Sequence, residues 1–510
     1  VYAFTASRIR ARVEGFAWTV GLEALLLAVP FALGDRVALF SQVTHALGAL
    51  GFDGFVGAWF LVTLVVVFPS SVVSGYQFPL LIALLGRGTR DVGTHTGYAY
   101  AWNTGGAIAG SLAGGFGILP LLSAPGTWVG VVTILSALGC VAAILTLRST
   151  RRLVSGLGAA ATAAAAVALV FSSTGPTAVW RHSGIGAGRP LVSMSDMTGL
   201  HNSVNGVRRA LAWEAEGVEC SVGLTNADGY AFVINGKIDG NVISDAPTQI
   251  MFPLVGAALH PAPRKAFVIG LGTGCSAGWL AEVPSMERVD VAELEPAIVE
   301  VARVCAPANY DAMNHPKVRL VLGDARETLL CAPDTYDLIV SEPSNPYRAG
   351  IASLYTREFY EAVAGRLGEG GIFVQWMQAY EIDSQTVRTV YCTLGSVFDC
   401  VTTWQTDATD MVLVCSKGAL DFDAAALRAR LSTEPFHTGL TRIWRGKDLE
   451  SFLSRFVANA EFGRRVGHQQ PLRLNTDDRT LIEFGFARSL GREGSFEIDD
   501  LRNLAREWGC

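Results

Sequence analysis

The sequence predicts a multi-pass α-helical membrane region, followed by a small β-sheet subdomain and an α/β domain with a parallel sheet. Three observations support this fold class. Only 17% of the 510 residues are charged, whereas a soluble protein carries about 25%. Residues 1–180 hold nine Arg, no Lys and five acidic residues, while residues 181–510 hold 31 basic and 41 acidic residues, a net charge of −10. From residue 265 onward, apolar runs alternate with helical stretches, as in doubly wound sheets.

The composition also excludes several classes of protein. Half of the residues are hydrophobic, which is too many for a disordered chain, and nine Cys are too few for a disulfide scaffold. The sequence has no CxxC pair, no metal-ligand helix motif and no strong basic patch. We therefore expect neither a metal ion nor a nucleic acid as partner.

Residues 1–180 are expected to form about five helices that span a lipid bilayer, each of which needs about 20 apolar residues. The expected spans are residues 15–34, one long helix over 54–86, two crossings within 92–147, and residues 153–172. A cleaved signal peptide does not explain them, because there are several.

A few residues mark special positions in these helices. Pro69 is expected to kink the long helix, and Pro120 and Pro125 are expected at the turn between the two crossings. Glu23 lies well inside the first span, where a carboxylate is costly. Either it has a functional role, or its side chain snorkels to the membrane surface or pairs within the bundle.

The Arg residues of the loops predict an orientation. With five crossings, all of them except Arg36 gather on one side, which the positive-inside rule places in the cytoplasm. The C-terminal domain would then lie outside, although one miscounted helix reverses this prediction. The chain begins with Val1 rather than Met, which leaves open whether further helices precede it.

Residues 181–256 are expected to contain the β-sheet subdomain, because apolar and polar residues alternate over 206–236 around a turn at Asn226–Gly229. An α/β domain is expected over 257–420 and a helical extension over 421–510. The expected strands of the α/β domain are KAFVIGL, RVDVAEL, VRLVLGD, YDLIVSE and GIFVQWM.

A glycine-rich turn, GLGTG, follows the first of these strands and contains Gly270, Gly272 and Gly274. Glycine lets the backbone approach a ligand closely, and parallel sheets bind ligands at the carboxyl ends of their strands. The dinucleotide pattern would require glycine at position 275, which is Cys275. The G-x-G-x-G form is more typical of S-adenosyl ligands.

Acidic residues end the second and third strands. Glu293, 23 residues after Gly270, can accept hydrogen bonds from both hydroxyls of a ribose. Glu295 is the nearby alternative, and a solvated loop acid is the other interpretation. Asp324 can meet an adenine amino group, cap the following helix, or do both.

The fourth strand ends in the segment SEPSNP, where two prolines make the loop stiff. Glu342 supplies a carboxylate and Asn345 an amide, which together can bind and orient an amine. A plain turn is the alternative.

These residues resemble the spermidine synthase family of aminopropyltransferases. The matching segments are NGKIDGN, SDAPTQ, LHPAPRKAFVIGLGTG, VAELEP, GDAR and YDLIVSEPSNPYRAG. FPLLIALLGRGTRDVGTHTGYAYAWNTGGAIAGSLAGG and the tail LNTDDRTLIEF are similar to bacterial proteins that fuse a transporter-like membrane region to such a domain. The resemblance implies a Rossmann-like methyltransferase-type fold, a location in the bacterial plasma (inner) membrane, and a homodimer through the soluble domain.

The resemblance also implies a reaction. A polyamine such as putrescine attacks the methylene beside the sulfonium of decarboxylated S-adenosylmethionine, which yields a longer polyamine and methylthioadenosine. Glu342 corresponds to the family's catalytic Asp, and Asn345 to a second Asp of that loop. Asp239 stands where the family has Gln, while Asp245 and Gln249 match the family. Glu342 would be the base or amine anchor, assisted by Asp239, Asp245 and Asn345.

The resemblance assigns seven residues to the adenosyl ligand: Gly270, Gly272, Thr273, Gly274, Glu293, Asp324 and Gln249. Thr273 stands where the family has an Asp that favours an aminopropyl ammonium and repels the carboxylate of intact S-adenosylmethionine. Because this chain lacks that Asp, two alternatives stay open. One is a methyltransferase that uses S-adenosylmethionine, and the other is a non-catalytic ligand-binding domain of a membrane transporter or sensor. Adenosyl sulfonium ligands are made in the cytoplasm, so the side of the soluble domain also stays open.

Overall fold

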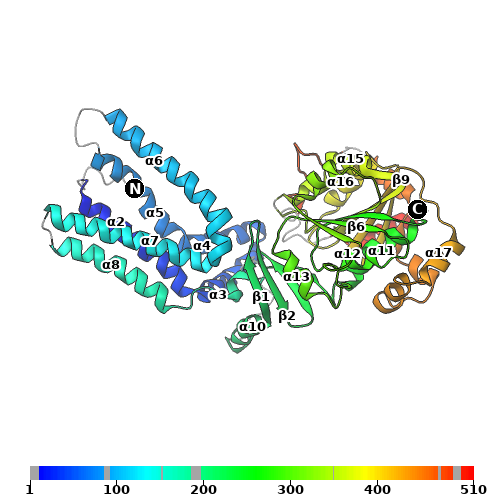
Figure 1. Cartoon of the computed structure of the whole chain (residues 1–510), viewed down its shortest axis with the longest axis horizontal. Helices are drawn as coiled ribbons and strands as arrows, with labels where there is room; N and C mark the ends of the chain where they lie inside the picture. Colours follow the sequence, from blue (N-terminus) through cyan, green and yellow to red (C-terminus); the bar gives the residue numbers. More distant parts are fainter. Residues whose placement is uncertain are drawn as a thin grey trace. The chain divides into compact units, whose positions relative to one another are not determined.

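The computed structural model describes residues 11–85, 92–150, 153–184, 197–348, 350–468, 473–485 and 496–510. Within these ranges the chain divides into two compact units (Figure 1). Unit 1 comprises Val1–Gly223 and Val233–Lys237, and unit 2 comprises Leu224–Phe232 and Ile238–Cys510. The four domain ranges expected from the sequence stay predictions, and residues 185–196, near the start of the expected β-sheet subdomain, lie outside the described residues.

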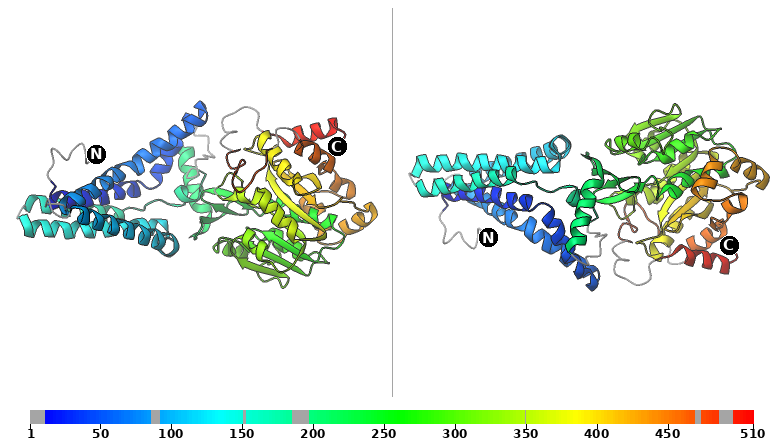
Figure 2. Two further views of the ribbon diagram at one scale, coloured as in Figure 1. Left: turned by 90° about the horizontal axis from the view of Figure 1, so that it is seen from above. Right: turned by 90° about the horizontal axis from the view of Figure 1, so that it is seen from below.

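Unit 1 is built on long apolar helices. Helices α2 (Val13–Leu33), α7 (Leu119–Thr150) and α8 (Leu153–Ser172) pack against one another, and α7 and α8 run side by side in both views of Figure 2. A Cβ atom on Gly21 would meet the backbone oxygen of Ala159 at 3.1 Å. Small residues therefore let α2 approach α8 closely, as they do in membrane helix bundles.

Four helical stretches of the described residues are long and apolar enough to cross a membrane, judged by length and composition. They are Val13–Leu33, Phe68–Leu85, Gly93–Arg148 and Val154–Ser172. The third stretch covers nearly all of α6 (Val92–Ala113) and of α7.

The helix expected over 54–86 is divided at Val67 into α4 (Phe52–Val66) and α5 (Phe68–Leu85). Pro69 lies in the first turn of α5, where its missing N–H removes no helical hydrogen bond. The division therefore falls where the sequence predicts a kink.

The break between α6 and α7 lies close to Pro120 and Pro125. A short π-helical turn, η2 (Gly114–Ile118), leads to α7, in which Ser123 has a non-helical φ of 61°. Ser123 lies between Pro120 and Pro125, so the irregular backbone coincides with the predicted turn.

The acid inside the first span has a partner. Gln77 Nε2 on α5 donates a hydrogen bond to Glu23 Oε2 on α2 at 2.7 Å. The pairing role within the bundle is therefore confirmed, and a functional role of Glu23 stays a prediction.

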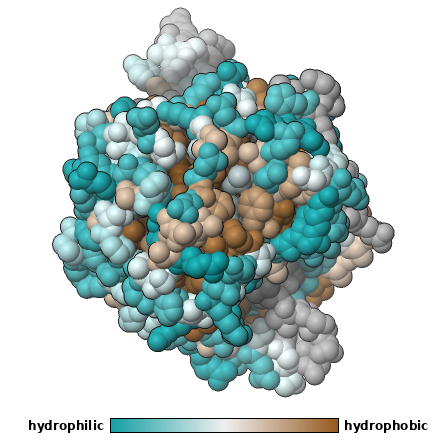
Figure 3. Space-filling view, turned by 90° about the vertical axis from the view of Figure 1, so that its right-hand side faces the viewer, coloured by the Kyte–Doolittle hydropathy of each residue, from teal (hydrophilic) through white to brown (hydrophobic). Residues whose placement is uncertain are grey.

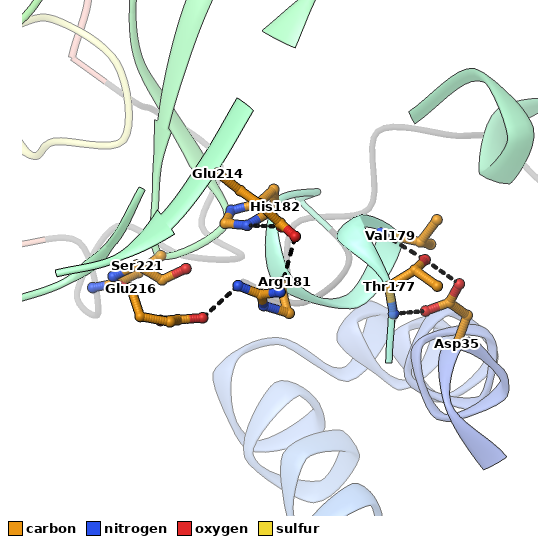
Figure 4. Close-up of polar contacts among 9 residues, drawn as sticks. Asp35, Thr177, Val179, Arg181, His182, Glu214, Glu216 and Ser221 are labelled. Atoms are coloured by element: carbon orange, nitrogen blue, oxygen red, sulfur yellow. Dashed lines mark hydrogen bonds and ion pairs between the residues drawn. The ribbon is translucent and has the colours of Figure 1, made fainter. Parts of the chain in front are cut away.

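Shorter helices complete unit 1: α3 (Asp35–Thr44), η1 (His45–Leu50), α9 (Ala178–Arg181) and α10 (Met197–Ala210). Asp35 joins three of these elements, and Figure 4 shows its contact with Thr177. Its carboxylate accepts hydrogen bonds from the Thr177 backbone N at 2.8 Å and from Thr177 Oγ1 at 2.5 Å, and it pairs with Arg208 at 2.6 Å.

Asp35→Ala is expected to destabilise unit 1 by about 1–3 kcal/mol, because the Thr177 N–H would lose its acceptor in a partly buried place. A lower midpoint of thermal unfolding in detergent would show this. Asp53→Ala removes an exposed carboxylate and should change stability by less than about 0.5 kcal/mol. Equal midpoints for the two variants would contradict the prediction.

A four-stranded sheet follows within the described residues, in the order β1 (Leu211–Glu216), β2 (Ser221–Asn226), β3 (Tyr230–Ile234) and β4 (Lys237–Asn241). Gly229 has a φ of 89° in the turn before β3, as the turn motif predicts. The strand prediction is wrong over 206–210, which form the end of α10. Val204 and Val207 lie three residues apart and pack together in one apolar cluster, a helical rather than a strand spacing.

Unit 2 contains an eight-stranded sheet, as far as the structure describes it, in the order β12-β10-β11-β9-β8-β5-β6-β7. The five strands that the sequence predicts are confirmed as neighbouring parallel strands. They are β5 (Lys265–Ile269), β6 (Arg288–Glu293), β7 (Val318–Leu322), β8 (Tyr336–Ser341) and β9 (Leu367–Gln378). The sheet has the Rossmann-like methyltransferase fold, and its order reverses between β5 and β8, where such sheets bind ligands.

Three further strands run antiparallel beyond β9: β10 (Cys400–Asp407), β11 (Asp410–Ser416) and β12 (Phe456–Ala458). The sequence did not predict them. β12 lies in the segment that was expected to be helical, and it adds an edge strand to the sheet.

Helices and short turns cover the sheet: α11 (Ala246–Leu259), α12 (Cys275–Ala281), α13 (Ile298–Val304), α14 (Ala325–Cys331), η3 (Ile351–Tyr355), α15 (Arg357–Arg366) and α16 (Ser384–Gly395). The C-terminal helices are α17 (Ala424–Leu431), α18 (Phe436–Thr438), η4 (Gly439–Ile443), α19 (Leu449–Leu453), α20 (Ala460–Gly467) and α22 (Ile498–Glu507). Helix α11 is buried on all sides, as its apolar run IMFPLVGAAL requires. The face shown in Figure 3 is mostly hydrophilic, with apolar residues gathered in its central part.

Candidate active site

The glycine-rich turn lies at the carboxyl end of β5. Gly270, Gly272 and Gly274 have φ values of 89°, 51° and 77°, a region that side chains rarely adopt. A Cβ atom on Gly270 would lie 3.6 Å from the backbone oxygen of Glu342. The turn therefore passes directly beside the loop that follows β8.

Glu293 fixes this turn from the neighbouring strand. Its Oε2 accepts a hydrogen bond from the Leu271 backbone N, and its Oε1 accepts one from the Glu295 backbone N, both at 2.9 Å. Burial raises the pKa of Glu293. Glu295 is turned to the start of the next helix, where its Oε1 accepts from the Ala297 backbone N, so Glu293 is the acid that contacts the turn.

Asp324 caps a helix. It is exposed and accepts a hydrogen bond from the Glu327 backbone N at 2.8 Å, at the start of α14. The capping interpretation is confirmed, and contact with adenine stays a prediction.

Thr273 and Gln249 form a buried pair beneath the turn, in which Thr273 Oγ1 donates to Gln249 Oε1. Ser276 Oγ lies 2.8 Å from the Gln249 backbone oxygen and 2.7 Å from Glu342 Oε2. Serine has a single hydroxyl proton. The hydroxyl can therefore donate to only one of these two oxygens at a time, and when it donates to Glu342 it stabilises the carboxylate.

Glu342 follows β8, next to the point where the sheet reverses. Burial is the main reason that the pKa of Glu342 is raised to about 7. The Ser276 hydroxyl lowers the pKa, while the charges of Asp410 and Asp245 raise it further. Glu342 thus exchanges a proton near neutral pH, which suits a general base.

Asp410 belongs to this group, although no role was expected for it from the sequence. Burial raises its pKa to about 6, and the charge of Asp245 raises it as well. Thr248 Oγ1 donates to its Oδ2 at 2.7 Å, and Trp376 Nε1 donates to its Oδ1 at 3.1 Å. The sequence offers one signal for Asp410, which is that this acid directly precedes the apolar run MVLVC.

The other residues predicted for the amine have partners within unit 2. Asp239 Oδ2 pairs with Arg348 at 2.9 Å and accepts from Ser344 Oγ at 3.1 Å. Asp245 accepts from the Asn241 backbone N at 2.8 Å, just before α11. Asp239 is therefore paired with Arg348 of the same chain, and the role predicted from the sequence did not include this ion pair.

Asn345 is buried in the loop after β8. Its Nδ2 donates to Gln378 Oε1 and, at 3.1 Å, to Tyr380 Oη. Its Oδ1 has no hydrogen-bond partner among the residues that the structure describes.

Neither a metal nor a reactive thiol is indicated here. Over the described ranges, no three His, Cys, Asp or Glu side chains are grouped so that they could hold a metal ion. Burial raises the pKa of Cys275 to about 12, so its thiol stays protonated and packs behind the turn.

Comparison with known proteins finds similar sequences for one part of this chain. Residues 248–409 match the model of the spermine/spermidine synthase domain. A polyamine aminopropyltransferase of Nitrosomonas europaea is 33% identical over 170 residues, which are 32% of this chain and 52% of that protein. Putrescine N-methyltransferase 2 of Nicotiana attenuata is 30% identical over 171 residues, 33% of this chain and 46% of that protein.

Solved structures include spermidine synthase from Thermotoga maritima, with a TM-score of 0.43 and 20% identity over 51% of this chain and 87% of that chain. The chain spans about half the length of the two curated relatives named above. Over residues 248–409, this chain is therefore similar to the spermine/spermidine synthase domain.

Proposed function

We propose that this protein transfers an aminopropyl group from decarboxylated S-adenosylmethionine to a polyamine such as putrescine. The amine nitrogen attacks the methylene carbon beside the sulfonium, and a new C–N bond forms. The C–S bond breaks, and its electron pair leaves with sulfur as neutral methylthioadenosine. The observation that carries the proposal is Glu342, a carboxylate with a pKa of about 7 beside the glycine-rich turn.

Glu342 has two tasks in this reaction. The amine arrives as an ammonium, because its pKa lies near that of Lys, and it must lose a proton before it can attack. Glu342 pairs with the ammonium, orients it and accepts that proton. Asp245 and Asn345 complete the amine side, and Asp239 acts from its ion pair with Arg348. Holding both reactants in position supplies much of the remaining acceleration.

The adenosyl side uses the residues at the carboxyl ends of β5, β6 and β7. Gly270, Gly272 and Gly274 let the backbone approach the co-substrate, and Thr273 with Gln249 supports the turn from below. Glu293 is the acceptor for the ribose hydroxyls, and Asp324 reaches the adenine while it caps α14.

Methylation by intact S-adenosylmethionine is the second candidate. Thr273 carries no charge that would repel the carboxylate of that molecule, and a relative bears the name putrescine N-methyltransferase. Purified protein should be offered each sulfonium compound with a panel of amines, and the products identified by mass spectrometry. Methylthioadenosine with a longer polyamine supports the first proposal, and S-adenosylhomocysteine supports the second. Binding of a ligand without either product would refute both and point to a transporter or sensor.

The pH dependence of the reaction follows from the pKa of Glu342. Lowering the pH through about 7 protonates Glu342, and a protonated carboxyl group cannot accept a proton. We expect kcat/KM to fall about tenfold per pH unit below that value and to level off above it. In Ser276→Ala the inflection should move to higher pH, because the Ser276 hydroxyl lowers the pKa of Glu342. A profile without an inflection near neutral pH would contradict this role of Glu342.

The apolar helices of unit 1 support a location in a membrane. Trp102, Leu121 and Val154 are 81%, 83% and 88% exposed, which is unfavourable in water and favourable in lipid. The four apolar stretches, the third of which holds both α6 and α7, then supply about five crossings of the bacterial inner membrane. The soluble domains of two copies form a dimer. A reporter fused to the C-terminus would tell which side the soluble domain faces.

A further inference from the structure

The segment NTDDR, residues 475–479, lies outside the part of the chain that is similar to the spermine/spermidine synthase domain. The proposed reaction gives this segment no task. In the structure it contacts the first turns of α14 and α15, the helices that come after β7 and β8. The segment thus reaches the side of the sheet where the reactants are proposed to bind.

Asn475 anchors the segment in the core of unit 2. Its side chain is fully buried, and Nδ2 donates to the backbone oxygens of Ala352 and Tyr355 at 3.2 and 3.1 Å. Both oxygens belong to η3, the turn that leads from the loop after β8 to α15. The backbone N of Asn475 donates to Thr393 Oγ1 at 3.0 Å, and its backbone oxygen accepts from Arg357 N at 2.9 Å. These hydrogen bonds fix the backbone of the segment.

Two residues later, Asp477 forms an ion pair with Arg326 of α14, which is 151 residues away in the sequence. Arg326 Nη1 donates to Oδ1 at 2.8 Å and Nη2 donates to Oδ2 at 2.5 Å. A bidentate pair of this kind fixes the direction of both side chains. The backbone N of Asp477 donates to Glu358 Oε2 at 3.0 Å, so the carboxylate that holds Arg326 stands on a fixed backbone.

Arg326 lies two residues after Asp324, the residue proposed to reach the adenine. Gly323 precedes Asp324 with a φ of 157°, so the backbone has the freedom of glycine at this point. The hydrogen bond with Asp477 is the main reason that the pKa of Arg326 is raised. The charges of Glu358 and Asp324 raise it as well. Without Asp477, the guanidinium would be free to turn toward Asp324 and to shift the first turn of α14.

We propose that Asp477, anchored through Asn475, is a positioning residue that holds Arg326 and the first turn of α14 so that Asp324 meets the adenine of the co-substrate. This inference rests on the proposed function, which places the adenine at Asp324. It adds a segment beyond residues 248–409 to the adenosyl side of the site. Asp477 acts through Arg326, so it affects binding of the co-substrate and not the rate of transfer once the co-substrate is bound.

Binding of methylthioadenosine should be measured by calorimetry on the full chain in detergent, alongside kcat and the KM for decarboxylated S-adenosylmethionine. We expect Asp477→Asn to weaken binding and to raise this KM about fivefold, the effect of losing a well-formed ion pair, while kcat stays within about twofold. Asp477→Glu keeps the charge and should retain most of the affinity. Asp478→Asn, which neutralises the exposed carboxylate next in the sequence, should leave affinity and KM unchanged.

A second comparison separates the ion pair from a general loss of structure. Arg326→Gln and the double variant Arg326→Gln/Asp477→Asn should each show the same loss as Asp477→Asn, because every one of these changes breaks the same pair. The affinity for 1,4-diaminobutane at saturating methylthioadenosine should not change in any of the three variants.

Normal binding of methylthioadenosine by Asp477→Asn would overturn the inference. An additive loss in the double variant would overturn it too, and a loss that extends to kcat and to the amine would show a general structural role instead. A chain that shows the expected losses in binding yet forms no product would refute aminopropyl transfer and leave this inference standing. If the unaltered chain did not bind methylthioadenosine, both proposals would fail.

Discussion

Replacing Glu342 with Gln is expected to lower the rate of aminopropyl transfer about 10²- to 10⁴-fold, the usual contribution of a positioned general base. The amide keeps the size of the side chain and its contact with Ser276. It cannot accept the proton of the attacking ammonium, and it lacks the charge that holds the ammonium in place. The loss should therefore appear in kcat as well as in the KM for the amine.

Two comparisons make this result specific. Glu369→Gln alters an exposed carboxylate on β9 and should keep the rate within about twofold of the original. The affinity of Glu342→Gln for methylthioadenosine should also stay the same, because that ligand contains no ammonium. A variant that transfers the aminopropyl group at the normal rate would remove Glu342 from the mechanism.

Short-range patterns predicted the parallel part of the sheet well. KAFVIGL and YDLIVSE are apolar runs bounded by turn residues, and each became a buried strand, with the glycine-rich turn after the first and Glu342 after the second. The positive φ values of Gly270, Gly272 and Gly274 could be anticipated, because a tight turn after a buried strand requires them.

Long-range partners could not be predicted in this way. Asp410 reaches the site from an antiparallel strand, 68 residues after Glu342 in the sequence, and a local pattern does not reveal that β11 pairs with β9. The ion pair of Asp239 with Arg348 joins a hairpin to a distant loop. The helix cap formed by Asp324 could be predicted, because it involves only Asp324 and the backbone N of Glu327 three residues later.

Gly278→Ala is expected to destabilise unit 2 by about 3 kcal/mol or more, the upper range for an overpacked core. A Cβ atom at this position of α12 would lie 1.7 Å from the backbone oxygen of Asn309. Asn309 is fully buried, and its Nδ2 donates to the backbone oxygens of Thr273 and Ala302 at 2.7 and 2.8 Å. The missing side chain of Gly278 thus allows Asn309 to hold the glycine-rich turn in place.

The variant should lose affinity for methylthioadenosine along with stability, because a shift of Asn309 releases the backbone of Thr273 in the turn. Gly365→Ala is the matched control, since a Cβ atom there meets no atom within 4 Å and alanine favours the helix by up to about 1 kcal/mol. Thermal unfolding and calorimetry with methylthioadenosine measure both effects. If Gly278→Ala remained stable and bound methylthioadenosine normally, the position of the turn would not depend on Asn309, and the hydrogen bonds of Glu293 would have to hold the turn without it.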